Sequence, residues 1–198
     1  IASMEFVKYT KLITGITPEI IYEDDEKSDI VVLGSDADNE YVAQKIIDGD
    51  FPGFNFRYGT DDFSIRSAVI NNRKHLFLAG GRNRSLLYAV YTYFEKICGC
   101  RWFWDGDIIK KSDSMPIENI DITESPQFIY RGLRYFAHRG LDRFQAEMWG
   151  YKDWTKEIDW MLKKKLNLFM LRIGNDDLFQ KAFPDIVAYP ADDVKENK

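Results

Sequence analysis

Two stretches of the sequence decide the fold: residues 130–140 read YRGLRYFAHRG, and residues 166–177 read LNLFMLRIGNDD. The second is a nearly unbroken apolar run closed by a glycine and polar residues, which is typical of a strand covered on both faces of a parallel sheet. The first is a shorter mixed run that ends in charged residues. Read as two strands joined by a helix, they predict a βαβ unit, which can begin an open α/β sheet or a (β/α)8 barrel.

The segment between these strands has the period of an amphipathic helix. Apolar residues recur at the i, i+4, i+7 and i+8 positions, namely Trp154, Ile158, Met161 and Leu162. Asp153 or Thr155 is placed to cap the start of this helix. Three lysines, residues 163–165, suit the negative C-terminal end of its dipole. The sequence therefore predicts strand, helix and strand in succession.

Polar residues follow both predicted strands. His138 and Arg139 end the first, and Asn175, Asp176 and Asp177 end the second. In open α/β sheets and in barrels, chemistry gathers at the carboxyl ends of the strands, so these residues are candidate site residues. On this pattern alone, strand ends that simply meet water are an equally good interpretation.

Composition excludes several classes of protein. The chain has 198 residues, of which 45% are hydrophobic and 15% aromatic, enough for a real core. Its net charge of −5, without a long basic block, argues against nucleic acid as a partner. No apolar run approaches the roughly 20 residues that span a bilayer. No signal peptide is visible in the given sequence, and its start, Ile1-Ala2-Ser3, fits a trimmed or engineered start. Cys98 and Cys100 suit neither a disulfide framework nor a zinc site, and we expect them to pack near a helix end.

The front of the chain predicts an α+β sandwich at residues 1–122, built from two helix-flanked hairpin layers. Helices are expected at 5–14, 39–47 and 86–97, and strands at 18–22, 30–34, 63–70, 75–79 and 101–104. Residues 110–126 are polar and contain two prolines, so we interpret them as a linker.

Two motifs in this front half allow a second interpretation. The acidic residues Asp24, Asp25 and Glu26 could hold a metal ion, although solvated turn carboxylates are far commoner. Gly80 and Gly81 precede a helix and could expose N–H groups to a nucleotide phosphate. Their spacing matches neither G-x-G-x-x-G nor a P-loop, and a tight strand-to-helix turn explains them better.

The order of a small α+β domain, a proline-containing linker and a barrel start resembles glycosidases related to the hexosaminidases. Residues 93–100 and 104–107 are similar to the end of the N-terminal domain in α-N-acetylglucosaminidases, glycoside hydrolase family 89. Residues 130–131, 149–161 and 167–168 resemble that family's first barrel helix and the strands beside it. The chain departs from that family's Asn and Cys late in the first strand, where it has Tyr135 and Ala137.

Family 20 β-hexosaminidases are a rival match. Residues 131–133, Arg-Gly-Leu, and Arg139 resemble that family's first strand and its substrate-holding arginine. Residues 165–167 and 176–177 resemble the surroundings of its second strand. The His-Trp-His of family 20 is replaced here by Met-Leu-Arg at residues 170–172.

The resemblance implies a hexosaminidase domain-2-like α+β domain at 1–122. At 123–198 it implies a linker and the first βα units of a (β/α)8 TIM barrel, truncated at Lys198. The full enzyme would cleave terminal N-acetylhexosamine or a related sugar. In both families the catalytic carboxylates lie on later strands, so we expect no catalytic residue in this chain, and no cofactor or metal. The expected partner is a carbohydrate substrate, with the oligomeric state left open.

Arg139 and His138 are the residues we expect to line the sugar pocket as hydrogen-bond donors. Arg134 and Asp176 are weaker candidates for substrate binding. For each of them, a structural salt bridge at the strand ends is an equally good interpretation.

A function of a different class is a non-catalytic carbohydrate-binding or scaffold module. In that case four tryptophans would form an exposed stacking platform: Trp102, Trp104, Trp149 and Trp154. Tryptophans this close to helices are more often core, so their exposure decides between the two hypotheses.

Overall fold

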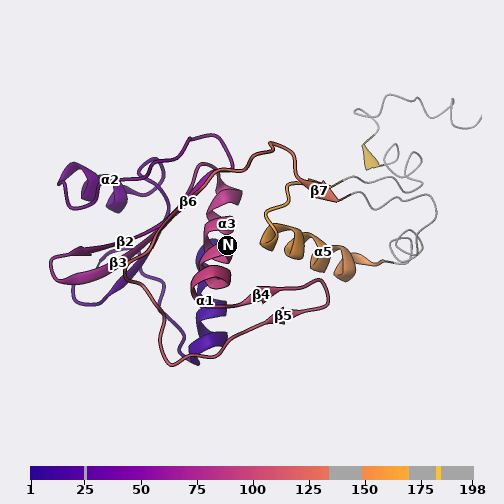
Figure 1. The fold of residues 1–198 in the computed structure, drawn as a ribbon, viewed down its shortest axis with the longest axis horizontal. Helices are drawn as coiled ribbons and strands as arrows, with labels where there is room; N and C mark the ends of the chain where they lie inside the picture. The colour runs from indigo at the N-terminus through magenta and orange to yellow at the C-terminus, as the bar shows by residue number, and fades with distance from the viewer. Residues whose placement is uncertain (25, 134–148, 170–181, 184–198) are drawn as a thin grey trace, which may run out of the picture. The chain divides into compact units, whose positions relative to one another are not determined.

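The computed structural model describes residues 1–24, 26–133, 149–169 and 182–183. The chain divides into two compact units: Ile1–Arg131 with Thr155–Asn167, and Gly132–Trp154 with Leu168–Lys198. In chain order the elements (Figure 1) are α1 (Ala2–Thr14), β1 (Ile30–Leu33), α2 (Glu40–Ile47), β2 (Phe63–Ile70), β3 (Arg73–Gly80), α3 (Asn83–Thr92), the π-helix η1 (Tyr93–Ile97), β4 (Arg101–Trp102), β5 (Asp107–Ile108), β6 (Asp121–Glu124), β7 (Gly132–Leu133), α5 (Tyr151–Lys163) and β8 (Leu168–Phe169).

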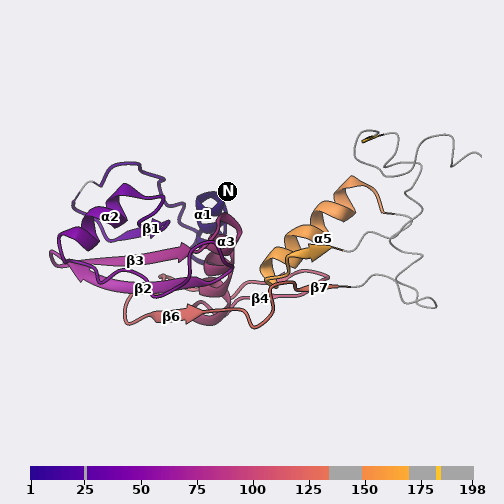
Figure 2. The ribbon, with the colours of Figure 1, turned by 90° about the horizontal axis from the view of Figure 1, so that it is seen from above.

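The first unit is an α+β fold built on a four-stranded mixed sheet in the order β1-β3-β2-β6 (Figure 2). Its centre is the hairpin of β2 and β3, paired antiparallel from Phe63 opposite Gly80 to Ile70 opposite Arg73. Asn71 and Asn72 form the turn with φ angles of 52° and 61°. Asparagine tolerates this left-handed region, which a two-residue hairpin turn requires. The predicted hairpin is confirmed.

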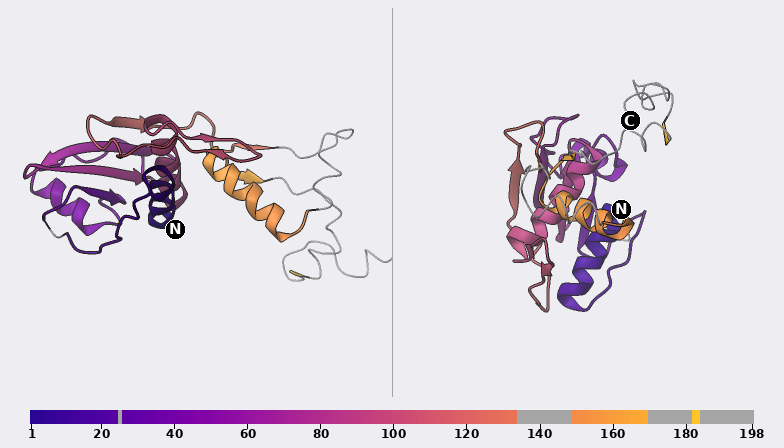
Figure 3. Two further views of the ribbon diagram at one scale, coloured as in Figure 1. Left: turned by 90° about the horizontal axis from the view of Figure 1, so that it is seen from below. Right: turned by 90° about the vertical axis from the view of Figure 1, so that its right-hand side faces the viewer.

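Helices cover both faces of this sheet. Successive residues of β3 alternate between two cores, because side chains of a strand point to opposite faces. Leu76 and Leu78 pack with α1 and α3, whereas Phe77 packs with α2 and Phe51. In Figure 2 helix α2 lies over the sheet, and the opposite view in the left panel of Figure 3 brings α1 to the front. The main core is highly aromatic, since it contains Phe6, Tyr9, Phe63, Tyr88, Tyr91, Tyr93, Phe94 and Trp102.

The predicted layering of two hairpins is wrong. Residues 18–22 form no strand, and β1 pairs parallel with β3, from Ile30 opposite His75 to Leu33 opposite Leu78. The error has a physical cause. A four-residue run rich in β-branched residues fits any strand, and only its position at the edge of the β2–β3 hairpin sets its partner and direction.

The linker interpretation of residues 110–126 is wrong for residues 121–124. These form β6, which pairs antiparallel with β2 from Phe63 opposite Glu124 to Arg66 opposite Asp121. Just before it, Ile120 is buried in the main core, and its backbone N–H donates to Ser67 Oγ at 2.8 Å. Only the alternation of Ile120 and Ile122 with polar residues signals this edge strand.

Several predicted helix ends are confirmed. Gly15 ends α1 in the left-handed conformation, with φ 80°, and donates its N–H to the Lys11 carbonyl. Asn39 caps α2 by accepting hydrogen bonds from the N–H groups of Tyr41 and Val42. Both cysteines are free thiols beside the end of η1, and Cys100 is fully buried, as expected from the sequence.

Helix α5 confirms the predicted helix but turns a different face inward. It begins at Tyr151, and the Asp153 carboxylate accepts from the Gly150 N–H at 2.9 Å. Met161 is buried as predicted, but Ile158 is 49% exposed. The other buried residue of α5 is Glu157, whose carboxylate accepts a hydrogen bond from Trp104 Nε1. Burial raises the pKa of Glu157 above its ordinary value, against the opposing effect of this bond.

Gly80 is placed where only glycine fits. A Cβ there would lie 2.3 Å from the Leu86 backbone nitrogen and 2.5 Å from the Ser85 carbonyl carbon, both backbone atoms that cannot yield. We expect Gly80→Ala to destabilise the protein by about 1–3 kcal/mol, the usual cost of overpacking. Gly106→Ala is the matched control, because nothing lies within 4 Å of the Cβ it would add. Pulse proteolysis in urea measures both, and equal unfolding midpoints for the two variants would contradict this packing.

Candidate functional site

The four predicted sugar-binding residues lie outside the described residues. Arg134, His138 and Arg139 follow β7 in the sequence, and Asp176 follows β8. The structure describes β7 and β8, which precede these residues in the sequence, and the helix α5 that lies between the two strands in the chain. Their role in substrate binding therefore stays a prediction.

The strands themselves confirm the predicted crossover. β7 and β8 pair parallel, with Gly132 opposite Leu168 and Leu133 opposite Phe169, and α5 connects them. The strands approach closely, since a Cβ on Gly132 would lie 2.5 Å from the Leu168 carbonyl oxygen. In the same unit, the ring of Trp154 packs edge-on against Phe169, with 5.4 Å between ring centroids. Within the described residues, 132–133 and 168–169 thus form the parallel pair that the apolar pattern predicts.

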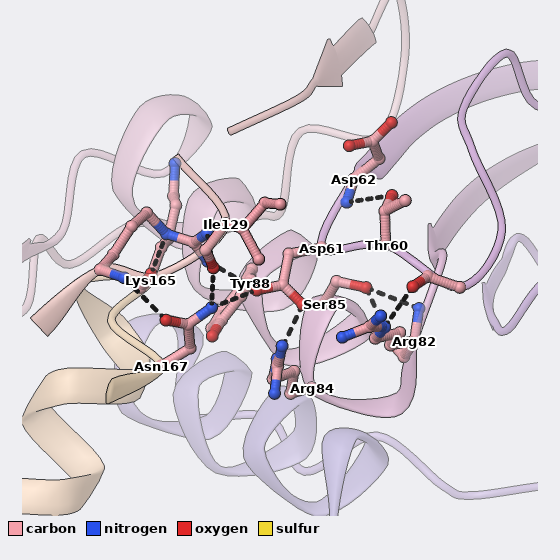
Figure 4. A network of polar contacts seen from close by, with 12 residues as sticks. Thr60, Asp61, Asp62, Arg82, Arg84, Ser85, Tyr88, Ile129, Lys165 and Asn167 are labelled. Atoms are coloured by element: carbon pink, nitrogen blue, oxygen red, sulfur yellow. Dashed lines mark hydrogen bonds and ion pairs between the residues drawn. The ribbon is translucent and has the colours of Figure 1, made fainter. Parts of the chain in front are cut away.

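A buried polar network holds the residue just before each of these strands (Figure 4). Its centre is Asp61, whose side chain is only 4% exposed. Oδ1 of Asp61 accepts from Arg84 Nε at 2.7 Å, and Oδ2 accepts from Arg131 Nη2 at 2.8 Å and Asn167 Nδ2 at 2.7 Å. Arg131 immediately precedes β7 and Asn167 immediately precedes β8. One carboxylate therefore binds the residues that precede the two strands in the sequence.

Arg131 and Asn167 are also bonded directly to each other. The Arg131 N–H donates to Asn167 Oδ1, and the Asn167 N–H donates to the Arg131 carbonyl, both at 2.8 Å. Arg131 Nε further donates to the Lys165 carbonyl at 2.8 Å, and Asn167 Nδ2 donates to the Ile129 carbonyl at 2.7 Å. Helix α3 adds Tyr88, whose hydroxyl donates to the Leu166 carbonyl at 3.2 Å. These bonds extend the parallel pairing of β7 and β8 by one residue.

The charge balance of the network favours an ionised Asp61. Burial alone would raise its pKa, but the hydrogen bonds from Arg84, Arg131 and Asn167 outweigh burial and hold the pKa below its ordinary value. The same bond to Asp61 raises the pKa of Arg84. Each oxygen of the carboxylate already accepts from protein groups. The network is therefore suited to holding backbone rather than to binding a ligand or transferring a proton.

Sequence reasoning did not single out Asp61. In the sequence it is one of two aspartates before a strand, and such residues ordinarily end a polar loop. Its partners Arg131 and Asn167 lie 70 and 106 residues away. The available signal was the position of Arg131 and Asn167 at the starts of the two predicted strands.

The turn at Gly80 and Gly81 does not present free N–H groups to a phosphate. The Gly81 N–H donates to the Asp62 carbonyl, and the Arg82 N–H donates to Ser85 Oγ, each at 2.8 Å. A Cβ on Gly81 would meet the carbonyl oxygens of Arg57 and Thr60, which would repel an anion. The tight strand-to-helix turn is the interpretation that this geometry supports.

The tryptophan platform is wrong for Trp102. This residue is fully buried, and its Nε1 donates to the Tyr91 carbonyl at 3.3 Å. Trp104 is 49% exposed, and its indole is bonded to Glu157. Trp149 and Trp154 are partly buried and pack against each other, with 4.8 Å between ring centroids. The four tryptophans therefore do not form the exposed stacking platform that the carbohydrate-binding hypothesis requires.

The acidic cluster at residues 24–26 contains an ion pair. Both oxygens of Asp24 accept from the Arg73 guanidinium, at 2.6 and 2.7 Å, and the Tyr41 hydroxyl donates to Oδ2 at 3.0 Å. These bonds with Arg73 hold the pKa of Asp24 well below its ordinary value. Tyr41 also contacts the buried ring of His75 through Nε2 at 2.9 Å. Across the described part of the chain, no group of three or more His, Cys, Asp and Glu residues suits a metal ion.

The known proteins to which parts of this chain are similar include glycoside hydrolases. The sequence matches no protein-family model. Over 94 residues it is 24% identical to an α-N-acetylglucosaminidase of Homo sapiens, a match that covers 48% of this chain and 12% of that protein. Helices within the described segments include none that is both long and apolar enough to cross a membrane.

The solved structures that resemble this chain include a family 89 glycoside hydrolase from Clostridium perfringens in complex with 2-acetamido-1,2-dideoxynojirimycin. The TM-score is 0.53 at 15% identity, over 98% of this chain and 18% of that chain. A doubly substituted form of the enzyme, in complex with its substrate GlcNAc-alpha-1,4-galactose, matches with the same TM-score at 14% identity. The fold of this chain is thus similar to part of a family 89 glycoside hydrolase, and the chain spans 18% of that enzyme and 12% of the human protein.

Proposed function

We propose that this chain is the N-terminal portion of a glycoside hydrolase that removes terminal N-acetylhexosamine, or a related sugar, from glycans. The observation that carries the proposal is the parallel crossover from β7 through α5 to β8. The resemblance in sequence and fold to enzymes that act on N-acetylglucosaminides supports it. Residues 1–122 would be an accessory α+β domain, and residues 123–198 would lead into the first βα units of a (β/α)8 barrel.

The sugar pocket would lie at the carboxyl ends of the strands that begin at Gly132 and Leu168. Active sites of such barrels are built at that end, whereas the opposite end serves stability. Arg139 and His138 would donate hydrogen bonds to sugar hydroxyls, with Arg134 and Asp176 as further contacts. The Asp61 network lies at the amino ends of the same strands, where a structural role is expected.

Cleavage would depend on residues that follow Lys198 in the full-length protein. Glycoside hydrolysis uses two carboxylates across the scissile bond, or one carboxylate with the acetamide of the substrate as nucleophile. We place these acids on later barrel strands. The residues of the present chain would hold and orient the sugar, and the reaction needs neither a cofactor nor a metal.

The full-length protein should hydrolyse aryl N-acetylhexosaminides. We expect faster release from the N-acetylated sugar than from the matching glucoside, because the acetamide is recognised. Preference for the α-anomer of N-acetylglucosamine would agree with the similarity to family 89, and preference for the β-anomer would favour the family 20 alternative. The proposal fails if no aryl glycoside in either anomeric series is cleaved at a rate above the solvent background.

A further inference from the structure

We propose that Asp61 is a positioning residue that sets the register of β7 against β8. Its effect on catalysis rests on the function proposed above, but its effect on register does not. The proposal is built on one juxtaposition: a single buried carboxylate binds the side chains of the residues immediately preceding two parallel strands.

Asp61 contributes to fixing which way the Asn167 amide faces. A carboxylate only accepts hydrogen bonds, so the donor Nδ2 of Asn167 must face it. Oδ1 then faces the Arg131 N–H, to which it is bonded at 2.8 Å. With the amide reversed, Oδ1 would oppose the carboxylate and Nδ2 would oppose the Arg131 N–H. The Ile129 carbonyl accepts from the same Nδ2 at 2.7 Å, so Asp61 and this carbonyl together favour the amide orientation that bonds to the Arg131 N–H.

Asp61 also holds the Arg131 side chain that ties down the turn before β8. Through its other nitrogens the guanidinium donates to the carbonyls of Phe128 and Lys165, both at 2.8 Å. Lys165 has a φ of 61°, in the left-handed region that non-glycine residues rarely adopt. A second contact, from Lys165 Nζ to Glu124 at 2.7 Å, supports the same turn. Losing Asp61 would release one of the restraints on this conformation.

Register matters for a site built at the other end of the strands. A slip of one residue moves a strand by about 3.3 Å and turns each side chain to the opposite face. Groups that bind a sugar productively tolerate displacements of only about 0.5 Å. Because Arg139 and Asp176 follow β7 and β8 respectively, a wrong register would separate or misdirect them even with both residues intact.

Asp61→Asn tests the proposal, with Asp62→Asn as the matched control. Asparagine keeps the shape of aspartate but removes its negative charge and replaces one accepting oxygen with a donor. Either Arg84, on one oxygen, or both Arg131 and Asn167, on the other, then face a donor instead of an acceptor. Asp62 is equally suitable as a substitution site, because it is 1% exposed and bonded to Arg57 at 3.0 and 3.1 Å. It has no bond with Arg131 or Asn167 among the contacts of the described residues. Loss of a buried, ion-paired carboxylate in general should therefore affect both variants, and loss of register only the first.

The direct readout is amide hydrogen exchange of Arg131 and Asn167 in the full-length protein. Their N–H groups form the two reciprocal bonds, so we expect exchange to accelerate about tenfold or more in Asp61→Asn, as the loss of a charged hydrogen bond allows. Asp62→Asn should leave these two amides within about twofold of the parent. Unchanged exchange in Asp61→Asn, or equal acceleration in both variants, would overturn the proposal.

Kinetics on an aryl N-acetylhexosaminide give the second readout. We expect Asp61→Asn to lower kcat about tenfold at a temperature where the protein stays folded, and Asp62→Asn to remain within about twofold. A parental kcat in Asp61→Asn, with accelerated exchange, would overturn the link from register to catalysis. If the parent protein hydrolyses nothing, the proposed function fails, whereas hydrogen exchange still decides the role of Asp61 in the register.

Discussion

Arg139→Ala in the full-length protein should lower kcat/KM on aryl N-acetylhexosaminides by roughly ten- to a hundredfold. A hydrogen bond from a charged donor to a sugar hydroxyl contributes about 1.5–3 kcal/mol, and each 1.4 kcal/mol corresponds to a factor of about ten. His138→Ala should cost less, because a neutral donor contributes only about 0.5–1.5 kcal/mol. Steady-state kinetics of the purified variants measure both effects.

Arg101→Ala is the matched control for this substitution. Arg101 is an exposed arginine of β4, and its guanidinium donates to the carbonyls of Glu95 and Cys100. It lies within the first unit and follows neither β7 nor β8, so kcat/KM should stay within about twofold of the parent. If Arg139→Ala retains the parental kcat/KM, Arg139 does not bind the sugar, and the equally good interpretation of a structural salt bridge gains support.

Trp102→Ala should destabilise the N-terminal unit by about 3–5 kcal/mol, the usual cost of truncating a buried tryptophan to alanine. The ring is fully buried and packs against Tyr9 and Tyr91, with centroid distances of 4.9 and 5.9 Å. Lys163 Nζ lies 5.3 Å from the ring centroid, so α5 contributes to the same contact. Pulse proteolysis in urea, read on the N-terminal fragment, reports the unfolding free energy.

Phe103→Ala provides the control, because the neighbouring Phe103 is 51% exposed and exposed substitutions usually change stability by less than about 0.5 kcal/mol. The result also distinguishes the glycosidase hypothesis from the alternative of a non-catalytic carbohydrate-binding module with an exposed tryptophan platform. A Trp102→Ala variant as stable as the parent would mean that the ring lies outside the core, and a stacking platform would again be possible. A large loss of stability places Trp102 in the core.

Elements with strong local signals were predictable from the sequence. The β2–β3 hairpin followed from Asn71 and Asn72 between two apolar runs, and α1 ended at Gly15 as expected. The parallel pairing of β8 with β7 followed from an apolar run too continuous for a half-exposed strand. In each case the deciding signal is a pattern of residues that are neighbours in the sequence.

Features that depend on distant partners were not predictable. The direction of β1 is set by its pairing with β3, and the edge strand β6 forms by pairing with β2. No local sequence pattern specifies either partner. The Asp61 network needs residues from four separate segments, so its geometry exists only in the folded chain. The buried Glu157 interrupts a face that periodicity assigned to apolar residues, because its bond from Trp104 reaches across 53 positions of sequence.

A crystal structure of the full-length protein with a bound N-acetylhexosamine analogue would test both the parallel strand pair and the proposed sugar site. We predict that the sugar lies at the carboxyl ends of the strands beginning at Gly132 and Leu168, within hydrogen-bond distance of Arg139. The two strands should remain parallel, with Gly132 opposite Leu168. A strand from Leu168 that runs antiparallel to the one from Gly132, or a sugar bound away from these strand ends, would contradict the glycosidase assignment.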